Sequence, residues 1–347
     1  MKDNSITNVS VIIPFYNRDE FIIEIINAID RENQHLLLNI EIIFVDSNSS
    51  NNIYSIIKYI KNISDLNIRV INTLNSAGEK RNFGIKSAQS EYIICIDDDC
   101  IPATDFIKNH LLKLQNSNSE KVIYSGLVKF PSRLRDNSNY YRFRDYRHRV
   151  YDSMYSLNNE IDFHKFITMN MSFKKSAIIK NNLFFDTDYK TYGLEDTQFG
   201  LDAIKKGFSL QTCIAPIIHR ESTSIDLFIL KTRHFAQNYF FTFYKKNENY
   251  LSERIKSDIK SRGFDNHAPI IKLAKWRNDN SSKYRLAMKI LRIIPISLKP
   301  IIYILKTYLN ISDKTRILYS YKIYRFLMII IVISTLFDRK LKTKNFI

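Results

Sequence analysis

The first hundred residues alternate between short apolar runs and segments with helical periodicity. The apolar runs are residues 9–14, 40–45, 68–72 and 92–96. After the first run, isoleucines recur at the spacing of one helix face, at positions 22, 25, 26 and 29, and residues 53–60 repeat this pattern. Continuous apolar runs of this length are typical of strands buried on both faces. The alternation therefore predicts parallel β-α-β units and an α/β fold.

Carboxylates follow two of the predicted strands. Asp46 comes directly after the run 40–45, and Asp97, Asp98 and Asp99 come directly after the run 92–96. The carboxyl ends of parallel strands meet at one edge of a sheet, which is where ligands bind in open α/β folds. We therefore expect these four acids on one rim.

The run of three aspartates needs a cationic partner, because like charges repel and apolar surroundings disfavour ionised carboxylates. Two interpretations are open. A solvated turn would leave the acids in water. A divalent cation site would use Asp97 and Asp99, which point the same way if the backbone there is extended, and the cation would bridge a diphosphate.

The pattern changes after about Lys121. Strands are predicted at 122–130, 167–173 and 209–214, with a helix from Glu195 to Gly207. Beyond about Asp226 the chain turns to basic, Tyr-rich helical stretches, including 285–309 and 323–337. The last stretch is apolar but shorter than the roughly 20 residues that span a bilayer. We expect one domain over 1–225 and a basic helical region over 226–347.

Charge and cysteine content narrow the classes of binding partner and the cellular compartment that we expect. The 347 residues include 52 Lys and Arg against 35 acidic residues, a formal net charge of +17. This excess predicts anionic partners: nucleic acid, nucleotide phosphates or an anionic membrane surface. Cys95, Cys100 and Cys213 form no CxxC pair, which favours a reducing compartment. The N-terminus lacks the long apolar stretch of a signal peptide, so we expect a cytoplasmic protein.

Five segments in this order resemble the motifs of family 2-like glycosyltransferases with a GT-A fold. They are VSVIIPFYNR (9–18), EIIFVDSNSS (41–50), SAGEKRNFGI (76–85), EYIICIDDDCIP (91–102) and YGLEDTQFGLDAIKKGF (192–208). The piece NMSFKKSAI…FFDTDYKTYGLED also resembles the galactosyltransferase and N-acetylgalactosaminyltransferase branch. The resemblance implies a Rossmann-like, mostly parallel sheet flanked by helices, with 1–225 as the catalytic domain and a C-terminal helical extension.

The resemblance also implies a donor site for a nucleotide-sugar. Pro14, Phe15 and Tyr16 would line the base pocket, although core packing is an equal alternative for Phe15. Asp46 would accept a hydrogen bond from a uracil N–H, which favours uridine or thymidine over adenine. Arg81 would lie near the base or the diphosphate. Its alternative is an exposed helix arginine.

The same resemblance gives roles to the three aspartates. Asp97 and Asp99 form a D-x-D pattern, and Asp99 is the first choice for contact with Mn²⁺ or Mg²⁺. Asp98 would reach the ribose hydroxyls. His219 would be a third metal ligand, with an ordinary structural histidine as the alternative. The cation would neutralise the leaving nucleoside diphosphate.

Glu195 and Asp196 match the family's E-D motif. Asp196 would be the base that takes the acceptor hydroxyl proton, and Glu195 would help to bind the acceptor. The alternative is an acid pair that only complements the helix dipole. The helix N-terminus should lower the pKa of these carboxylates, keeping them ionised but weakly basic.

Together these features predict a metal-dependent, inverting glycosyltransferase that moves a sugar from a UDP-sugar to a glycan or lipid-linked glycan in surface polysaccharide synthesis. The basic amphipathic stretch 285–309 predicts peripheral contact with the anionic inner face of the cell membrane, or alternatively a helical core. Two other classes remain open: a nucleic-acid-binding protein, suggested by YYRFRDYRHRVY (140–151), and an inactive GT-A scaffold. No recognised nucleic-acid module is evident, so nucleic acid is the less favoured partner.

Overall fold

The computed structural model divides the chain into two compact units. It describes residues 7–36, 38–49, 53–60, 66–74, 76–149, 160–190, 192–221, 224–251, 253, 294–315 and 319–337. Unit 1 comprises residues 1–137, 141–187 and 195–222, and unit 2 comprises 138–140, 188–194 and 223–347. The long C-terminal part of unit 2 thus begins at residue 223, where the sequence suggested 226.

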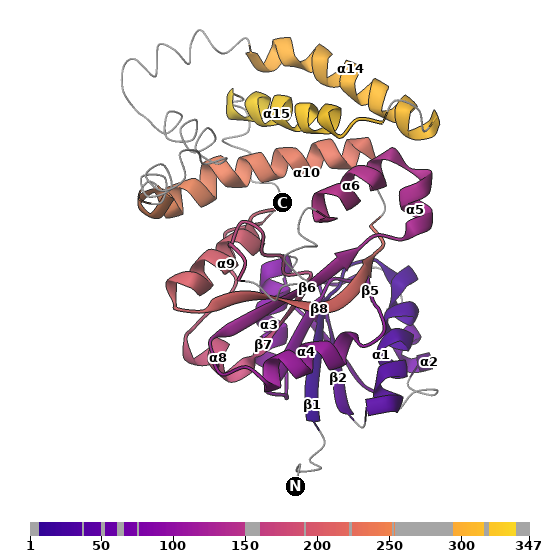
Figure 1. Ribbon diagram of the computed structural model, residues 1–347, viewed down its shortest axis with the longest axis vertical. Helices are drawn as coiled ribbons and strands as arrows, with labels where there is room; N and C mark the ends of the chain where they lie inside the picture. Colours follow the sequence, from indigo (N-terminus) through magenta and orange to yellow (C-terminus); the bar gives the residue numbers. More distant parts are fainter. Residues whose placement is uncertain are drawn as a thin grey trace. The chain divides into compact units, whose positions relative to one another are not determined.

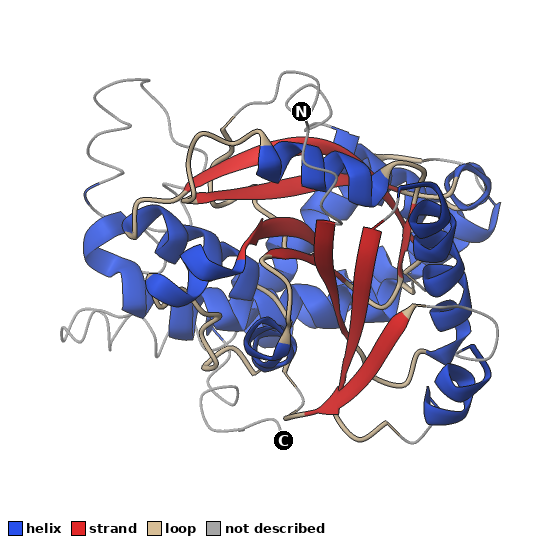
Figure 2. Cartoon of the chain, turned by 90° about the horizontal axis from the view of Figure 1, so that it is seen from below, coloured by secondary structure: helices blue, strands red, loops and turns tan. Residues whose placement is uncertain are grey.

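Unit 1 is built on one eight-stranded sheet in the order β3-β2-β1-β4-β7-β6-β8-β5. The strands are β1 (Thr7–Pro14), β2 (Leu38–Asp46), β3 (Asn67–Asn72), β4 (Tyr92–Ile96), β5 (Cys100–Pro102), β6 (Val122–Lys129), β7 (Asn170–Lys174) and β8 (Ser209–His219). Strands β1 to β4 are mutually parallel, as predicted. Strand β7 runs antiparallel to β4 and β6, β8 is parallel to β6, and β5 closes the edge antiparallel to β8. Figure 2 shows these strands as strongly twisted red arrows. The α/β class is confirmed.

Helices cover both faces of this sheet. Neighbouring residues of a strand point to opposite faces, so a strand that is apolar throughout needs a cover on each side. The helices of unit 1 are η1 (Asp19–Phe21), α1 (Ile22–Leu36), α2 (Ile53–Ile60), α3 (Ala77–Ser87), α4 (Phe106–Gln115), α5 (Ser132–Asn137), most of α6 (Asn139–Arg149), α8 (Lys175–Lys180) and α9 (Glu195–Lys205). Val9, Val11 and Ile13 share one buried cluster with the apolar residues of α1 and α4. Ile12 points to the other face, towards α3.

A glycine lets α3 lie close to the sheet. A Cβ atom at Gly84 would be 2.4 Å from Cγ2 of Ile12 and 3.2 Å from Cγ2 of Val45, so a larger residue would force the Ile12 side chain or α3 to shift. This close contact fixes the distance between the sheet and α3, which carries Lys80 and Arg81.

The described part of unit 2 contains three long helices: α10 (Ile225–Asn238), which continues into the π-helix η2 (Tyr239–Phe243), α14 (Ile294–Thr315) and α15 (Tyr321–Phe337). Figure 1 shows α15 between α10 and α14. The predicted helix 323–337 is confirmed, and so is the part of 285–309 from Ile294 on; residues 285–293 lie outside the described ranges. Within the described ranges, every helix is too short or too polar to cross a bilayer.

Candidate active site

The three aspartates form a turn at the carboxyl end of β4, which we call the acidic turn (Asp97–Asp99). The Cys100 N–H donates to the Asp97 carbonyl oxygen at 3.1 Å. The chain turns here because β4 pairs with β1 and β7, whereas the next strand, β5, pairs with β8 at the far edge. The expectation of an extended backbone was therefore wrong, and the carboxylates of Asp97 and Asp99 contact different partners.

The solvated-turn interpretation is also wrong. Asp98 and Asp99 are 8% and 5% exposed. Burial raises the pKa of Asp98 to about 7, although the guanidinium of Arg18 acts in the opposite direction. Two of the three acids are therefore held out of water, which requires cations nearby.

The first cation is Arg18, which follows β1. Its Nη1 donates to Oδ1 of Asp98 at 2.7 Å and to Oδ2 of Asp99 at 2.6 Å. Asn17, just before it, has φ of 52°, a left-handed conformation that asparagine tolerates better than most residues. Arg18 is the last residue of the motif VSVIIPFYNR (9–18), and no role was predicted for it. Its position after a parallel strand was the available signal.

The second cation is Arg81 on α3. Its side chain is 3% exposed, so the exposed-arginine alternative is wrong. Nη2 donates to Oδ1 of Asp97 at 2.5 Å, and Nη1 lies 4.0 Å from Oδ1 of Asp196. Neither Nε nor Nη1 has a hydrogen-bond partner within the described ranges. Arg81 thus links the acidic turn to the start of α9, and its Nε–H and Nη1–H groups can donate to a ligand.

Glu195 and Asp196 begin α9, as predicted. The Thr168 hydroxyl donates to Oδ1 of Asp196, and the Thr168 N–H lies 3.4 Å from Oδ2. Oε2 of Glu195 is buried and has no hydrogen-bond partner in the described part of the chain. Thr168 was missed, because a single threonine carries no sequence signal.

The pKa of this acid pair moves opposite to expectation. Burial raises the pKa of both Glu195 and Asp196, and Arg81 only partly offsets it. Loss of hydration therefore outweighs the helix N-terminus here. A raised pKa makes a carboxylate a stronger base, so Asp196 is better suited to accept a proton than the sequence suggested.

Asp46 lies at the end of β2, on the same rim as the acidic turn. It is 1% exposed, and its Oδ1 accepts a hydrogen bond from the Ser49 hydroxyl at 2.5 Å. The same hydroxyl accepts from the Asn17 N–H at 3.0 Å, which ties the loop after β1 to the loop after β2. Each carboxylate oxygen has two lone pairs, so Asp46 keeps acceptor capacity for a ligand.

The two aromatic candidates that follow β1 lie in different environments. Phe15 is fully buried and packs edge-on against Phe44, with ring centroids 6.1 Å apart, so the core interpretation holds for it. Tyr16, which directly follows Phe15, is 44% exposed, and its N–H donates to Oδ2 of Asp98 at 3.2 Å. The exposed ring of Tyr16 is therefore the one that a base could contact.

Lys80 is a further site residue that sequence reasoning missed. It is 4% exposed; its Nζ donates to the Phe15 carbonyl at 2.7 Å and lies 5.3 Å from the centre of the Tyr16 ring. Burial lowers the pKa of Lys80 to about 8, while Asp98 and Asp46 act in the opposite direction. Its place in EKRN, next to Arg81, was the signal.

A divalent cation fits the residues around Asp99. Ligand atoms of Asp99, Cys100 and His219 lie within 4.8 Å of one another, because Cys100 pairs with His219 across β5 and β8. Nε2 of His219 is 3.3 Å from Oδ1 of Asp99, and the buried Nδ1 has no hydrogen-bond partner among the described residues. Burial raises the pKa of the Cys100 thiol well above its usual range, which leaves carboxylate and imidazole as the donors. Asp97 is not part of this cluster.

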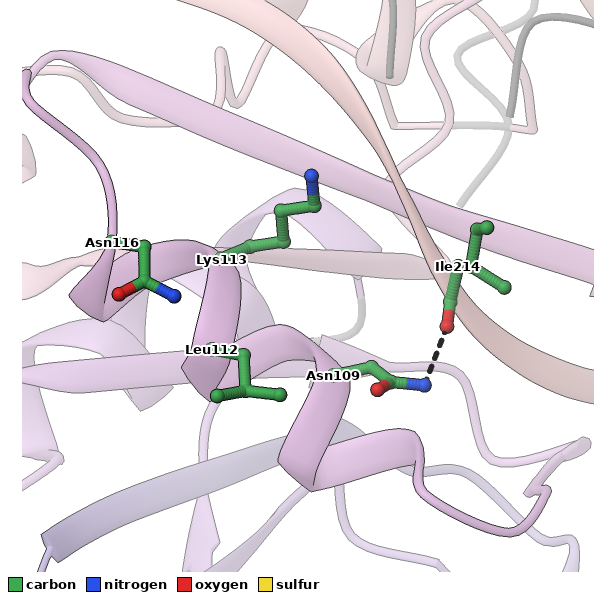
Figure 3. Close-up of a pocket in the computed structure, with 5 residues that line it drawn as sticks. All are labelled: Asn109, Leu112, Lys113, Asn116 and Ile214. Carbon is green, nitrogen blue, oxygen red and sulfur yellow. Dashed lines mark hydrogen bonds between the residues drawn. The ribbon is translucent and has the colours of Figure 1, made fainter. Parts of the chain in front are cut away.

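A surface pocket elsewhere in unit 1 carries none of these residues. It has a volume of about 440 Å³ and lies between α4 and β8. Figure 3 shows its lining: Asn109, Leu112, Lys113, Asn116 and Ile214. Nδ2 of Asn109 donates to the Ile214 carbonyl at 2.7 Å, and Lys113 is the charged residue among these five. The chemistry-bearing groups are instead gathered around the acidic turn.

Comparisons with known proteins give the family of this chain. Residues 10–181, about half of the chain, match the family model described as glycosyl transferase family 2. This segment includes most of β1, all of β2 and α3, the acidic turn and Thr168. The chain therefore belongs to glycosyl transferase family 2.

Two curated relatives illustrate how far the similarity extends. Glycosyltransferase GlyG of Streptococcus pneumoniae serotype 4 is 31% identical over 33% of this chain and 38% of its own length. The dolichyl N-acetyl-alpha-D-glucosaminyl phosphate 3-beta-D-2,3-diacetamido-2,3-dideoxy-beta-D-glucuronosyltransferase of Methanococcus voltae is 24% identical over 59% of this chain and 64% of its own length. The chain therefore matches less than two-thirds of either relative.

Among solved structures, the mannosyltransferase PcManGT from Pyrobaculum calidifontis, in complex with GDP-Man and Mn²⁺, shares the fold. The comparison covers 98% of this chain and 89% of that one, with a TM-score of 0.57 and 15% identity. The likeness to the galactosyltransferase branch stays a prediction, and so do the roles of the individual site residues.

Proposed function

We propose that this protein is a divalent-cation-dependent, inverting glycosyltransferase that moves a sugar from a UDP-sugar to a glycan or lipid-linked glycan acceptor in surface polysaccharide synthesis. The observation that carries the proposal is the position of Arg81 between Asp97 of the acidic turn and Asp196 of the acid pair. A donor-binding group and a base are thereby held within the reach of one buried guanidinium.

The acid pair supplies the acceptor chemistry. Asp196 takes the proton of the acceptor hydroxyl while that oxygen attacks the anomeric carbon of the donor sugar. The new C–O bond forms on one face as the bond from that carbon to the diphosphate oxygen breaks on the other, which inverts the configuration. Thr168 fixes the orientation of Asp196, and Glu195, whose Oε2 has no hydrogen-bond partner among the described residues, binds an acceptor hydroxyl.

The acidic turn supplies the donor chemistry. Asp99 and His219 would hold the cation, which when bound neutralises charge on the departing diphosphate. The mixed oxygen and nitrogen donor set suits Mn²⁺ better than Mg²⁺, which prefers oxygen ligands alone. Asp98 remains the candidate for the ribose, and Asp97 is the partner of Arg81.

Asp46 and Tyr16 are the proposed base-binding residues. A carboxylate at this position pairs with a base that carries an imide N–H, which uracil has and adenine lacks. Guanine also carries a ring N–H, and the mannosyltransferase PcManGT is in complex with GDP-Man. GDP is therefore the competing nucleotide.

The test is thermal unfolding of the full chain with UDP, GDP, ADP and CDP, each with and without Mn²⁺. A ligand at about 100 times its dissociation constant adds roughly 2.7 kcal/mol of stability, which is readily measured as a higher melting temperature. We expect UDP to raise the melting temperature and Mn²⁺ to enlarge the shift. A larger shift with GDP would change the donor, and no shift with any nucleotide would contradict the proposal.

The basic segment 140–151 does not favour nucleic acid as the partner. Tyr141, Phe143 and Arg144 on α6 are buried, and Nη1 of Arg144 lies 3.1 Å from Oε2 of Glu221. Aromatic rings that are already packed inside a domain cannot stack on bases. Exposed basic residues remain at Arg142 and Arg147, and a surface with charge alone binds nucleic acid weakly and without specificity.

We also propose that unit 2 rests on an anionic membrane surface at the inner face of the cell membrane. Helix α14 exposes Ile301, Ile304 and Ile311, which share one helix face, at 38%, 64% and 56%. Helix α15 exposes Phe326 and Ile329 at 49% and 55%. Exposed basic residues accompany these apolar ones: Lys299, Lys322 and Arg325. An apolar stripe with basic neighbours is typical of helices that lie in the membrane interface.

Flotation with phosphatidylglycerol and phosphatidylcholine vesicles tests this surface. Exchanging Lys322 and Arg325 for Gln removes two charges, each worth about 1 kcal/mol at an anionic surface, and should lower the partition coefficient about 30-fold. Leu112→Ser, which alters an exposed leucine of unit 1, is the matched control and should float like the wild type. Absence of flotation with anionic vesicles at low salt would remove the membrane proposal.

A further inference from the structure

Arg18 occupies an unusual position among the charged residues of unit 1. A single nitrogen, Nη1, contacts Oδ1 of Asp98 and Oδ2 of Asp99 at 2.7 and 2.6 Å. The side chain of Arg18 is 41% exposed, whereas those of Asp98 and Asp99 are 11% and 7% exposed. A half-exposed arginine on a loop therefore reaches down onto two carboxylates that are fixed and buried.

This contact uses the same carboxylate that a divalent cation would need. Oδ1 of Asp99 faces Nε2 of His219 at 3.3 Å, and Oδ2 is held by Arg18. Carboxylate oxygens contact Mn²⁺ or Mg²⁺ at about 2.1 Å. A bound cation and the Arg18 guanidinium would then share one small carboxylate at close range, where like charges repel strongly outside bulk water.

Release of the two carboxylates would require movement of the Arg18 side chain alone. Its partners Asp98 and Asp99 are fixed by the turn between β4 and β5, and the Arg220 N–H donates to the Asp99 carbonyl at 2.8 Å. The guanidinium, by contrast, is on the solvent side of the carboxylates and can leave by side-chain rotation alone. A displaced Arg18 stays at the rim where the diphosphate arrives, and guanidinium groups bind phosphate well.

We propose that Arg18 is a built-in competitor of the divalent cation. It neutralises Asp98 and Asp99 while the donor is absent, keeps free cation from binding, and leaves them for the diphosphate when donor and cation bind together. This inference rests on the cation site of the proposed function and adds a regulation to it: cation and nucleotide bind cooperatively, and Arg18 is the source of the cooperativity.

Binding of Mn²⁺ alone is the direct test, because it needs no turnover. Titration of the full chain is followed by the electron paramagnetic resonance signal of free Mn²⁺, without nucleotide and then with saturating UDP. Hydrogen bonds to charged groups correspond to about 10- to 150-fold in affinity, and the partial exposure of Arg18 points to the lower end. Arg18→Gln should therefore bind Mn²⁺ about tenfold more tightly without nucleotide, and UDP should enhance its Mn²⁺ affinity about tenfold less than in the wild type.

Arg220 offers a matched control. Its side chain is 40% exposed, close to the value for Arg18, but its guanidinium pairs with Glu24 instead of the acidic turn. Arg220→Gln removes the same charge from the same unit and should leave the Mn²⁺ affinity without nucleotide near the wild-type value. If the Mn²⁺ affinity increased equally in both variants, loss of any positive charge from unit 1 would explain the effect, and the inference would be overturned. Arg18→Lys, which keeps a positive charge on a different, non-planar group, should give an intermediate affinity.

The possible failures are distinguishable. If Asp99→Asn weakens Mn²⁺ binding and Arg18→Gln does not strengthen it, the cation site stands and the competitor role of Arg18 is wrong. If the wild type and Arg18→Gln both fail to bind Mn²⁺ with or without UDP, the cation dependence in the proposed function is wrong as well.

Discussion

Replacing Arg81 by Met removes the buried cation between the acidic turn and the acid pair. Taking away one partner of a buried ion pair costs about 3–5 kcal/mol, because the remaining charges stay out of water. The side chains of Asp97 and Asp196 are 28% and 26% exposed, so water compensates in part. We therefore expect the free energy of unfolding to fall by about 3 kcal/mol, the low end of that range, measured by urea denaturation.

The same substitution should change the pH dependence of transfer. Arg81 is the cation that holds down the pKa of Asp196 and Glu195 against the effect of burial. Without it, both pKa values rise further. A base must be ionised to accept a proton, so kcat/KM of Arg81→Met should begin to fall at a higher pH than in the wild type as the solution is acidified.

The lysine variant provides the control. Arg81→Lys keeps the positive charge but cannot direct separate donors at Asp97 and Asp196. It should retain most of the wild-type pH dependence and lose part of the stability. If Arg81→Met lost less than about 1 kcal/mol and its acidic limb matched the wild type, the idea that Arg81 electrostatically couples the two acidic groups would be refuted.

Three further predictions concern the acid pair and the packing of α3. Asp196→Asn should lower kcat about 10²- to 10⁴-fold and keep the melting shift caused by UDP with Mn²⁺, since a lost base does not weaken donor binding; a loss of that shift would count against the base role. Burial raises the pKa of Glu195 above its usual 4.5, so its contribution to stability is full below about pH 4.5 and is lost as the pH rises through the raised value. Glu195→Gln should therefore gain stability relative to the wild type between about pH 5 and about pH 8, and a constant difference in urea denaturation would contradict the shift. Gly84→Ala should cost about 1–3 kcal/mol, because the added Cβ would lie 2.4 Å from Ile12; unchanged stability would mean that α3 can move away from the sheet.

The sequence by itself determined the alternation of strands and helices up to β4 and the rim on which the acids lie. Alternating apolar runs and helical isoleucine patterns suffice for this, because parallel β-α-β units place all carboxyl strand ends at one edge. Asp46 at the end of β2 and the acidic turn at the end of β4 followed directly. The five ordered motifs added the class of enzyme.

Only the tertiary structure decided what each of these residues touches. The chain had to turn at Asp97–Asp99 to bring β5 to the far edge of the sheet, and this turn sent Asp97 to Arg81 and Asp99 to His219. The same folding partly buried Asp196 and raised its pKa, against the local effect of the helix N-terminus. Contacts between residues some eighty positions apart, such as Arg18 with Asp98, leave no local pattern, because they depend on how strands distant in the chain are ordered in the sheet.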